Sequence, residues 1–110
     1  MADECTDSAI APDALPREDV LTETERLLKG FANKTRLKIL CILRDGEVCV
    51  HEIVEVLDVS QSAVSHQLRM LRDARLVMGR REGRHVYYRL ADTHVQEMLE
   101  NALLHAKETG

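Results

Sequence analysis

The chain has 110 residues and a net charge of −4, with two tyrosines, one phenylalanine and no tryptophan. This length suits a single domain, and few aromatic but many aliphatic residues favour helix-on-helix packing over a β-sandwich. No apolar run is long enough to cross a bilayer. No charged segment followed by an apolar stretch resembles a signal peptide. The sequence therefore predicts a cytoplasmic protein with no membrane partner.

The charge is unevenly distributed along the chain. Residues 60–90 carry seven arginines and two acids, whereas residues 1–30 carry eight acids and three bases. A concentrated arginine block in an acidic protein is typical of a surface that binds phosphate groups. The three cysteines are scattered and odd in number, which in a reducing compartment indicates free thiols or metal ligands. Cys41 lies in an aliphatic run, where we expect a buried small hydrophobe.

The predicted elements begin after a flexible acidic arm at residues 1–18, which contains two prolines and several acids. Residues 19–110 form the second predicted region, a single folded domain. Apolar residues at three- and four-residue spacing predict a first helix from about Val20, which ends at Gly30. Asn33 is a suitable N-cap for a second helix that ends near Asp45 and Gly46.

The second half of the chain continues this pattern. A third helix is predicted from about Cys49 to Leu57, and a tight turn at 58–60 lets Ser60 cap a fourth helix over 61–74. Residues 76–81 and 84–90 are β-like and joined by Glu82 and Gly83, which is a hairpin signal. A fifth helix begins near Asp92, which suits either the N-cap or an acidic position of the first turn. The predicted order is α-α-α-α-β-β-α, a mainly helical fold with a small β-hairpin wing.

A short helix, a tight turn, a polar helix and an arginine-rich hairpin follow the order of a winged helix-turn-helix. The polar face of the fourth helix offers hydrogen-bonding side chains that suit a major groove, namely Gln61, Ser62, Ser65, His66 and Arg69. The hairpin adds side chains for phosphate or minor-groove contact, namely Arg80, Arg81, Arg84 and His85. The alternative is a solvated helix and a charged hairpin tip. Because the polar helix and the hairpin both lie in the only basic block of the sequence, we favour DNA binding.

Four metal-ligand residue types lie along the last helix: Asp92, His94, His105 and Glu108. The eleven residues from His94 to His105 span about 16 Å of helix, so one zinc ion cannot bind both pairs of one chain. Eleven steps of about 100° return His105 nearly to the face of His94. An antiparallel second helix would place each Asp/His pair opposite a His/Glu pair. Two nitrogen and two carboxylate ligands favour Zn(II), with Co(II) or Cd(II) as substitutes.

Four segments resemble the ArsR/SmtB family of metal-sensing repressors, over residues from about 20 to 108. They are Asn33–Leu40, Gly46–Val50, Ser60–Leu68 and Gly83–Tyr88. The resemblance implies a homodimer whose terminal helices pack together and whose recognition helices bind an inverted-repeat operator. It further implies that the metal-free dimer represses, that Zn(II) on the terminal helices releases the DNA, and that His105 starts the signal.

The same resemblance points to a second metal site. Relatives that sense soft metals place cysteines at the start of the third helix and in the N-terminal arm, where this chain has Cys49, His51 and Cys5, with Glu52 beside them. A thiolate, an imidazole and an arm thiolate suit zinc. A buried Cys49 with no ligand role is the equal alternative at this point.

Three other functions compete with zinc sensing. A redox-sensing repressor would use Cys5 and Cys49, and a soft-metal sensor for Cd(II) or Pb(II) would use the Cys49 and His51 site. A zinc hydrolase needs an open coordination position and a cleft. A small chain with four ligands in a closed site argues against an enzyme, so no small-molecule substrate is expected.

Overall fold

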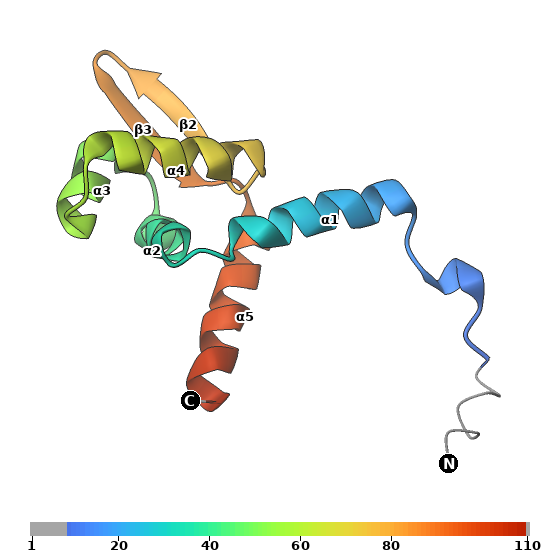
Figure 1. The fold of residues 1–110 in the computed structure, drawn as a ribbon. Coiled ribbons are helices and arrows are strands. Elements are labelled where there is room, and N and C mark those ends of the chain that lie inside the picture. Colours follow the sequence, from blue (N-terminus) through green and yellow to red (C-terminus); the bar gives the residue numbers. More distant parts are fainter. Residues whose placement is uncertain (1–8, 110) are drawn as a thin grey trace.

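The computed structural model describes residues 9–109 (Figure 1). An exposed segment with a 3-10 turn at Pro12–Ala14 precedes the first helix. The elements that follow are α1 (Glu18–Gly30), α2 (Lys34–Ile42), the 3-10 turn η3 (Leu43–Asp45), β1 (Val48–Cys49), α3 (Val50–Leu57), α4 (Gln61–Asp73), β2 (Val77–Glu82), β3 (His85–Leu90) and α5 (Thr93–Thr109). None of the described helices is long and apolar enough to cross a membrane.

The predicted helix caps are confirmed. The Asn33 side chain accepts a hydrogen bond from the Arg36 N–H at 3.1 Å, and the Ser60 hydroxyl accepts one from the Ala63 N–H at 3.1 Å. Asp92 Oδ1 accepts from the Val95 N–H at 3.0 Å. Each bond satisfies one backbone donor that the first helical turn leaves without a partner, so these local signals set where α2, α4 and α5 begin.

The sheet differs from the prediction in two respects. It has a third strand, β1, and the antiparallel order is β1-β3-β2. β1 is only two residues long, too short to leave an alternating pattern in the sequence. The hairpin turn is Gly83–Arg84 and not Glu82–Gly83, because Glu82 pairs with His85. Gly83 has a φ of 64°, which suits the first central residue of a two-residue hairpin turn.

The first helix begins slightly earlier than predicted, at Glu18. The acidic side chains of Glu18 and Asp19 lie in its first turn, where they interact favourably with the partial positive charge at the helix N-terminus. The predicted division of the chain at residue 18 stays a prediction.

One hydrophobic core joins α2, α3 and α4 to the base of the sheet and the first half of α5. Its fully buried large side chains are Ile39, Leu40, Leu43, Ile53, Leu68, Leu71, Leu76 and Leu99. The apolar face of α4 points into this core, since Val64, Leu68 and Leu71 are all buried. Gly79 leaves room for Tyr88 on the neighbouring strand, because a Cβ there would lie 2.9 Å from the tyrosine ring. The core therefore fixes α4 against the wing.

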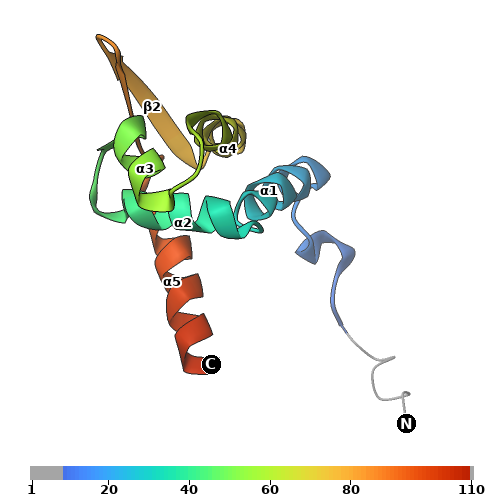
Figure 2. The same cartoon turned by 60° about the vertical axis from the view of Figure 1, so that its left-hand side comes forward.

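Helices α1 and α5 leave this core in different directions (Figures 1 and 2). The radius of gyration is 18.2 Å, whereas a compact chain of this length would give about 13 Å. Apolar side chains on both helices are exposed, with Leu28 on α1 and Leu104 on α5 each at 55%. The periodic apolar residues of α1 thus lie on a real helix, but much of their surface has no partner in this chain.

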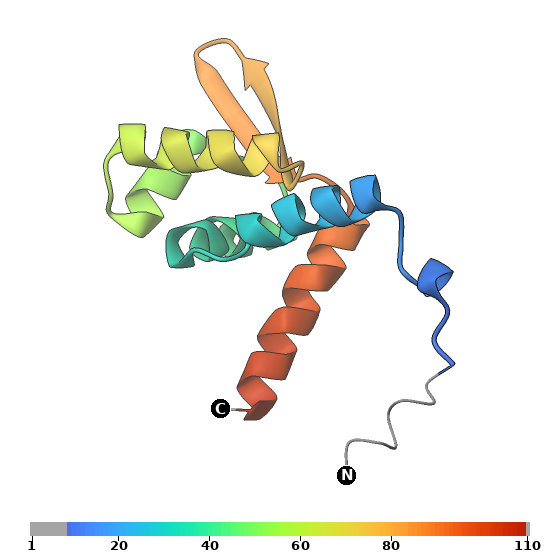
Figure 3. The ribbon, with the colours of Figure 1, turned by 45° about the vertical axis from the view of Figure 1, so that its right-hand side comes forward.

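Leu76 joins the projecting helices to the core. Its N–H donates to the Leu71 carbonyl of α4 at 2.9 Å, and its carbonyl accepts from the Ala91 N–H, just before α5, at 3.0 Å. Arg75 makes the turn after α4 with a φ of 64°. The Leu76 side chain packs so closely on Gly30 of α1 that a Cβ there would overlap it. In the view of Figure 3, α1 crosses in front of the start of α5.

Candidate functional site

The helix-turn-helix is formed by α3 and α4. Asp58 ends α3 in the left-handed conformation, with a φ of 55°, which a short polar side chain tolerates. The turn presents α4 with its polar face outward. Gln61, Ser62, His66 and Arg69 are exposed, and Ser65 is half-buried. The predicted DNA-contacting residues of this helix therefore share one accessible face.

A groove of about 250 Å³ runs between α4, the start of α3 and the wing. The positive side chains that line it are Arg69 and Arg72 from α4 and Arg84 from the hairpin turn. Arg72 is a candidate that the sequence analysis did not single out, although its spacing of three from Arg69 places it on the same stripe. Polar groups Gln61 and Ser65 complete this stripe along the groove.

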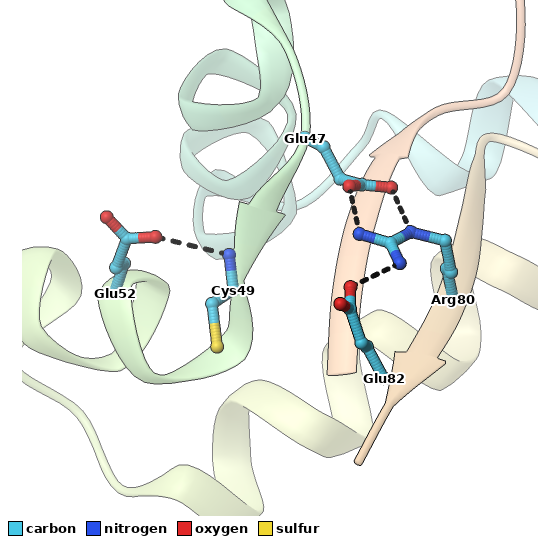
Figure 4. Close-up of polar contacts among 5 residues, drawn as sticks. All are labelled: Glu47, Cys49, Glu52, Arg80 and Glu82. Carbon is cyan, nitrogen blue, oxygen red and sulfur yellow. Dashed lines mark hydrogen bonds and ion pairs between the residues drawn. The ribbon is translucent and has the colours of Figure 1, made fainter. Parts of the chain in front are cut away.

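Arg80 differs from the other wing arginines because carboxylates already bind it (Figure 4). Its Nη2 and Nε donate to the two Glu47 oxygens at 2.7 and 3.0 Å, and its Nη1 donates to Glu82 at 2.7 Å. The guanidinium also lies 4.9 Å from the centre of the Tyr87 ring. The hydrogen bonds with Arg80 lower the pKa of the Glu47 carboxyl, and those with Glu47 and Glu82 raise the pKa of Arg80.

These bonds connect the wing to the segment before β1. Phosphate contact at Arg80, as predicted, would have to compete with two carboxylates. Arg81, Arg84 and His85 are exposed at the distal end of the wing, so the predicted DNA contacts there keep an open surface.

The terminal-helix ligands lie at the two ends of α5. Asp92 Oδ2 is 3.9 Å from His94 Nδ1, and both side chains are exposed. His105 and Glu108 are exposed on the last turns of the helix. Among residues 9–109, no group of three or more His, Cys, Asp or Glu side chains is arranged to hold a metal ion. A single chain therefore presents two separate pairs.

The residues of the predicted second metal site are arranged around the start of α3. Cys49 is buried, at 8% exposure, and its Sγ lies 3.8 Å from His85 Nδ1. His51 is exposed and its ring centre is 5.9 Å from that of His85. Glu52 accepts a hydrogen bond from the Cys49 N–H at 3.3 Å (Figure 4). Cys5 lies outside the described residues, and Cys41 is half-buried against the core.

Comparison with known proteins places this geometry in a family. Residues 33–78 match the family described as bacterial regulatory protein, arsR family. The chain is 40% identical over 107 residues to the HTH-type transcriptional repressor SmtB of Mycobacterium tuberculosis, covering 97% of this chain and 78% of that protein. It is 36% identical over 89 residues to a cadmium resistance transcriptional regulatory protein CadC homolog of Staphylococcus aureus. That match covers 80% of this chain and 74% of the homolog.

A solved structure supports the same assignment. The homodimeric winged helix-turn-helix DNA-binding domain from Mycobacterium bovis superposes with a TM-score of 0.80 and 29% identity, covering 93% of this chain and 92% of that one. The proteins it resembles are transcriptional regulators and not enzymes. The fold is a winged helix-turn-helix with a three-stranded antiparallel wing, and the chain belongs to the ArsR family of bacterial regulatory proteins.

Proposed function

We propose that this protein is a metal-responsive transcriptional repressor. In this proposal the metal-free homodimer binds an inverted-repeat operator, and Zn(II) bound between the two α5 helices releases the DNA. The single observation that carries the proposal is α5 itself, one uninterrupted helix with a ligand pair at each end. The relatives support regulation of this kind, since two of them are named as a repressor and as a cadmium resistance regulator.

The exposed apolar surface of α1 and α5 supports a dimer. Leu28 and Leu104 expose apolar side chains that a second chain would cover. A two-fold axis perpendicular to α5 would pair this helix with its own copy in antiparallel orientation. His94 and His105 lie about 20° apart around α5, so this pairing brings the Asp92/His94 pair of one chain to the His105/Glu108 pair of the other. The dimer would then contain two identical metal sites.

The basic groove supports operator binding. Arg69, Arg72 and Arg84 approach from two elements and line one concave surface beside the exposed end of α4. Guanidinium groups bind phosphate and guanine edges in two-pronged geometry. In the dimer, the two copies of α4 would meet successive major grooves of one operator. The acidic remainder of the chain limits non-specific DNA binding by charge repulsion.

The decisive experiment compares His105→Gln with Lys107→Gln, an exposed change on the same helix. Operator binding is measured by fluorescence anisotropy with and without Zn(II). The wild type and Lys107→Gln should lose at least about tenfold in operator affinity when zinc is added, which corresponds to about 1.4 kcal/mol of coupling. His105→Gln should bind the operator equally well in both conditions. Zinc-driven release that survives in His105→Gln would refute the terminal-helix switch.

The operator-binding surface has its own test. Replacing Arg84 with glutamine should lower the slope of log affinity against log salt by about one unit and weaken all sequences alike, as loss of a phosphate contact does. Arg17→Gln, outside the basic block, serves as the control. An unchanged slope for Arg84→Gln would remove the wing tip from the interface.

A further inference from the structure

A second groove lies between α2 and α3, on a part of the molecule that the proposed function does not use. It has a volume of about 400 Å³, and every residue that lines it belongs to one of these two helices. The operator-binding residues are on α4 and the wing, and the proposed dimer faces are on α1 and α5. Neither the operator nor a second chain is therefore expected to fill the α2–α3 groove.

The α2–α3 groove leaves apolar surface in contact with water. Val56 is 67% exposed, and the other apolar side chains that line the groove are half-buried. Water displaced from such a concave apolar surface favours binding of another apolar group. The apolar lining consists of Leu37, Cys41, Ile42, Val56 and Leu57.

Two lysines give the same groove a positive charge. Lys34 and Lys38 are four residues apart on α2, which places them on one side of the helix, and both line the groove and are exposed. Within residues 9–109 neither ammonium group makes an ion pair, whereas Lys29 pairs with Glu25 on α1 at the same spacing. Two unpaired charges beside an apolar surface complement an anion that has an apolar tail.

The size of the groove favours a small molecule over a protein partner. Small-molecule sites are typically about 300–1,000 Å³ in volume and combine a mainly apolar lining with a few charged or polar groups. A stable protein interface uses roughly 20–30 residues from each partner. Only seven residues line the α2–α3 groove, which is too small an area for such an interface.

The N-terminal segment of the same chain does not fit this groove. Its Leu15 is exposed and apolar, but the segment leaves α1 at the end that points away from α2 (Figure 1). Helix α1 has 13 residues and is about 20 Å long. The three residues from Leu15 to Glu18 reach about 10 Å at most, so Leu15 cannot enter the groove of its own chain.

We infer that the α2–α3 groove binds a small carboxylate with an aliphatic tail. The tail would contact Leu37, Ile42 and Val56, and the carboxylate would pair with Lys34 and Lys38. A lysine ammonium is a compact charge on a flexible stem, so both groups can turn toward one carboxylate. The site uses neither the terminal-helix residues nor a second chain, and its occupancy is independent of zinc.

Calorimetric titration of the reduced, metal-free, full-length chain with hexanoate, octanoate and decanoate tests this inference. We expect one carboxylate bound per chain, and each added methylene should tighten binding about fourfold. Octanol has a similar tail without the charge and should bind at least about tenfold more weakly than octanoate. Equal affinities for octanol and octanoate would exclude the lysines, and an affinity that does not change with tail length would exclude the apolar lining.

Substitutions at the groove provide a second test. Val56→Glu puts a negative charge beside the ligand, and Lys34→Gln combined with Lys38→Gln removes the positive ones. Each change should weaken octanoate binding at least about tenfold. The controls are Met78→Glu on β2, where the side chain is 49% exposed, and Lys107→Gln on α5, and both should bind like the wild type. Unchanged binding by Val56→Glu would exclude the α2–α3 groove.

Cys41 reports occupancy directly because it lines the groove. Octanoate should slow the alkylation of Cys41 by iodoacetamide in proportion to the fraction of chain bound, as measured by peptide mass spectrometry. Full reactivity of Cys41 at saturating octanoate would place the ligand elsewhere. Octanoate binding that tightens at least about tenfold in an Ile10→Ser, Leu15→Ser double variant would instead assign the groove to the N-terminal segment of a partner chain.

Discussion

The winged core and the two projecting helices obey the same hydrophobic pattern with different results. On α4, residues at three- and four-residue spacing are fully buried, as Leu68 and Leu71 are. On α1 and the second half of α5, equally periodic residues are exposed, with Leu28 and Leu104 at 55%. Periodicity therefore identifies the apolar face of a helix without saying which chain covers it. The core buries its apolar residues within the chain, whereas the projecting helices leave part of theirs exposed.

The largest expected effect lies in the core. Leu68→Ala should destabilise the fold by about 2–5 kcal/mol, because it leaves a cavity among fully buried side chains. The measurement is urea unfolding at fixed protein concentration. Val56→Ala on α3, where the side chain is 67% exposed, should change the free energy of unfolding by less than about 0.5 kcal/mol. Similar losses for both variants would contradict the distinction between buried and exposed apolar residues.

A smaller loss is expected where α1 contacts the core. In an ordinary helix, replacing glycine with alanine stabilises by up to about 1 kcal/mol. Gly30→Ala should instead destabilise by about 1–3 kcal/mol, because the new methyl group overlaps Leu76. Thermal unfolding followed by circular dichroism measures the difference, with Lys29→Ala as the control. Stabilisation by Gly30→Ala would mean that α1 does not pack on Leu76 in solution.

Substitutions on the exposed faces of α1 and α5 should weaken self-association more than they lower the stability of the fold. Leu28→Ser and Leu104→Ser should each weaken self-association at least about tenfold, or about 1.4 kcal/mol, because each removes apolar surface from the proposed interface. Sedimentation equilibrium gives the dissociation constant. Val56→Ser, a change at a side chain that is 67% exposed and lies outside both helices, should leave the dissociation constant unaltered. Weakening by Val56→Ser alone would place the interface on α3 instead.

The smallest effect concerns the Glu47–Arg80 ion pair, which connects the wing to the residue before β1. Hydrogen bonds with Arg80 lower the pKa of Glu47 below its ordinary value of 4.5. At pH values between the lowered native pKa and 4.5, the native state therefore binds fewer protons than the unfolded state. The resulting stabilisation is present above pH 4.5 and is lost as pH falls through the lowered native value. Glu47→Gln should therefore lose less stability between pH 5 and pH 3 than the wild type, by roughly the small amount typical of an exposed pair.

Urea unfolding at several pH values measures this difference, and Glu55→Gln on α3 is the matched control. Identical acid sensitivity in the wild type and Glu47→Gln would mean that the ion pair with Arg80 does not form in solution.

The features that the sequence predicted are local ones. Asn33, Ser60 and Asp92 cap their helices through bonds that span three residues, so the residue types alone locate them. Arg80 binds Glu47 across 33 residues and Cys49 approaches His85 across 36. Those contacts depend on the unpredicted strand β1, so no local pattern could reveal them. The terminal-helix ligands stay a prediction, because their proposed partners belong to another chain.

The backbone of Leu76 has a mechanical consequence. One of its hydrogen bonds holds the end of α4 and the other holds the residue before α5. The two bonds use the adjacent peptide groups on either side of the Leu76 Cα, and Gly30 brings α1 against the Leu76 side chain. Because α1, α4 and the segment before α5 all meet at this one residue, any movement of α5 relative to α4 would have to stretch or break one of the two Leu76 hydrogen bonds.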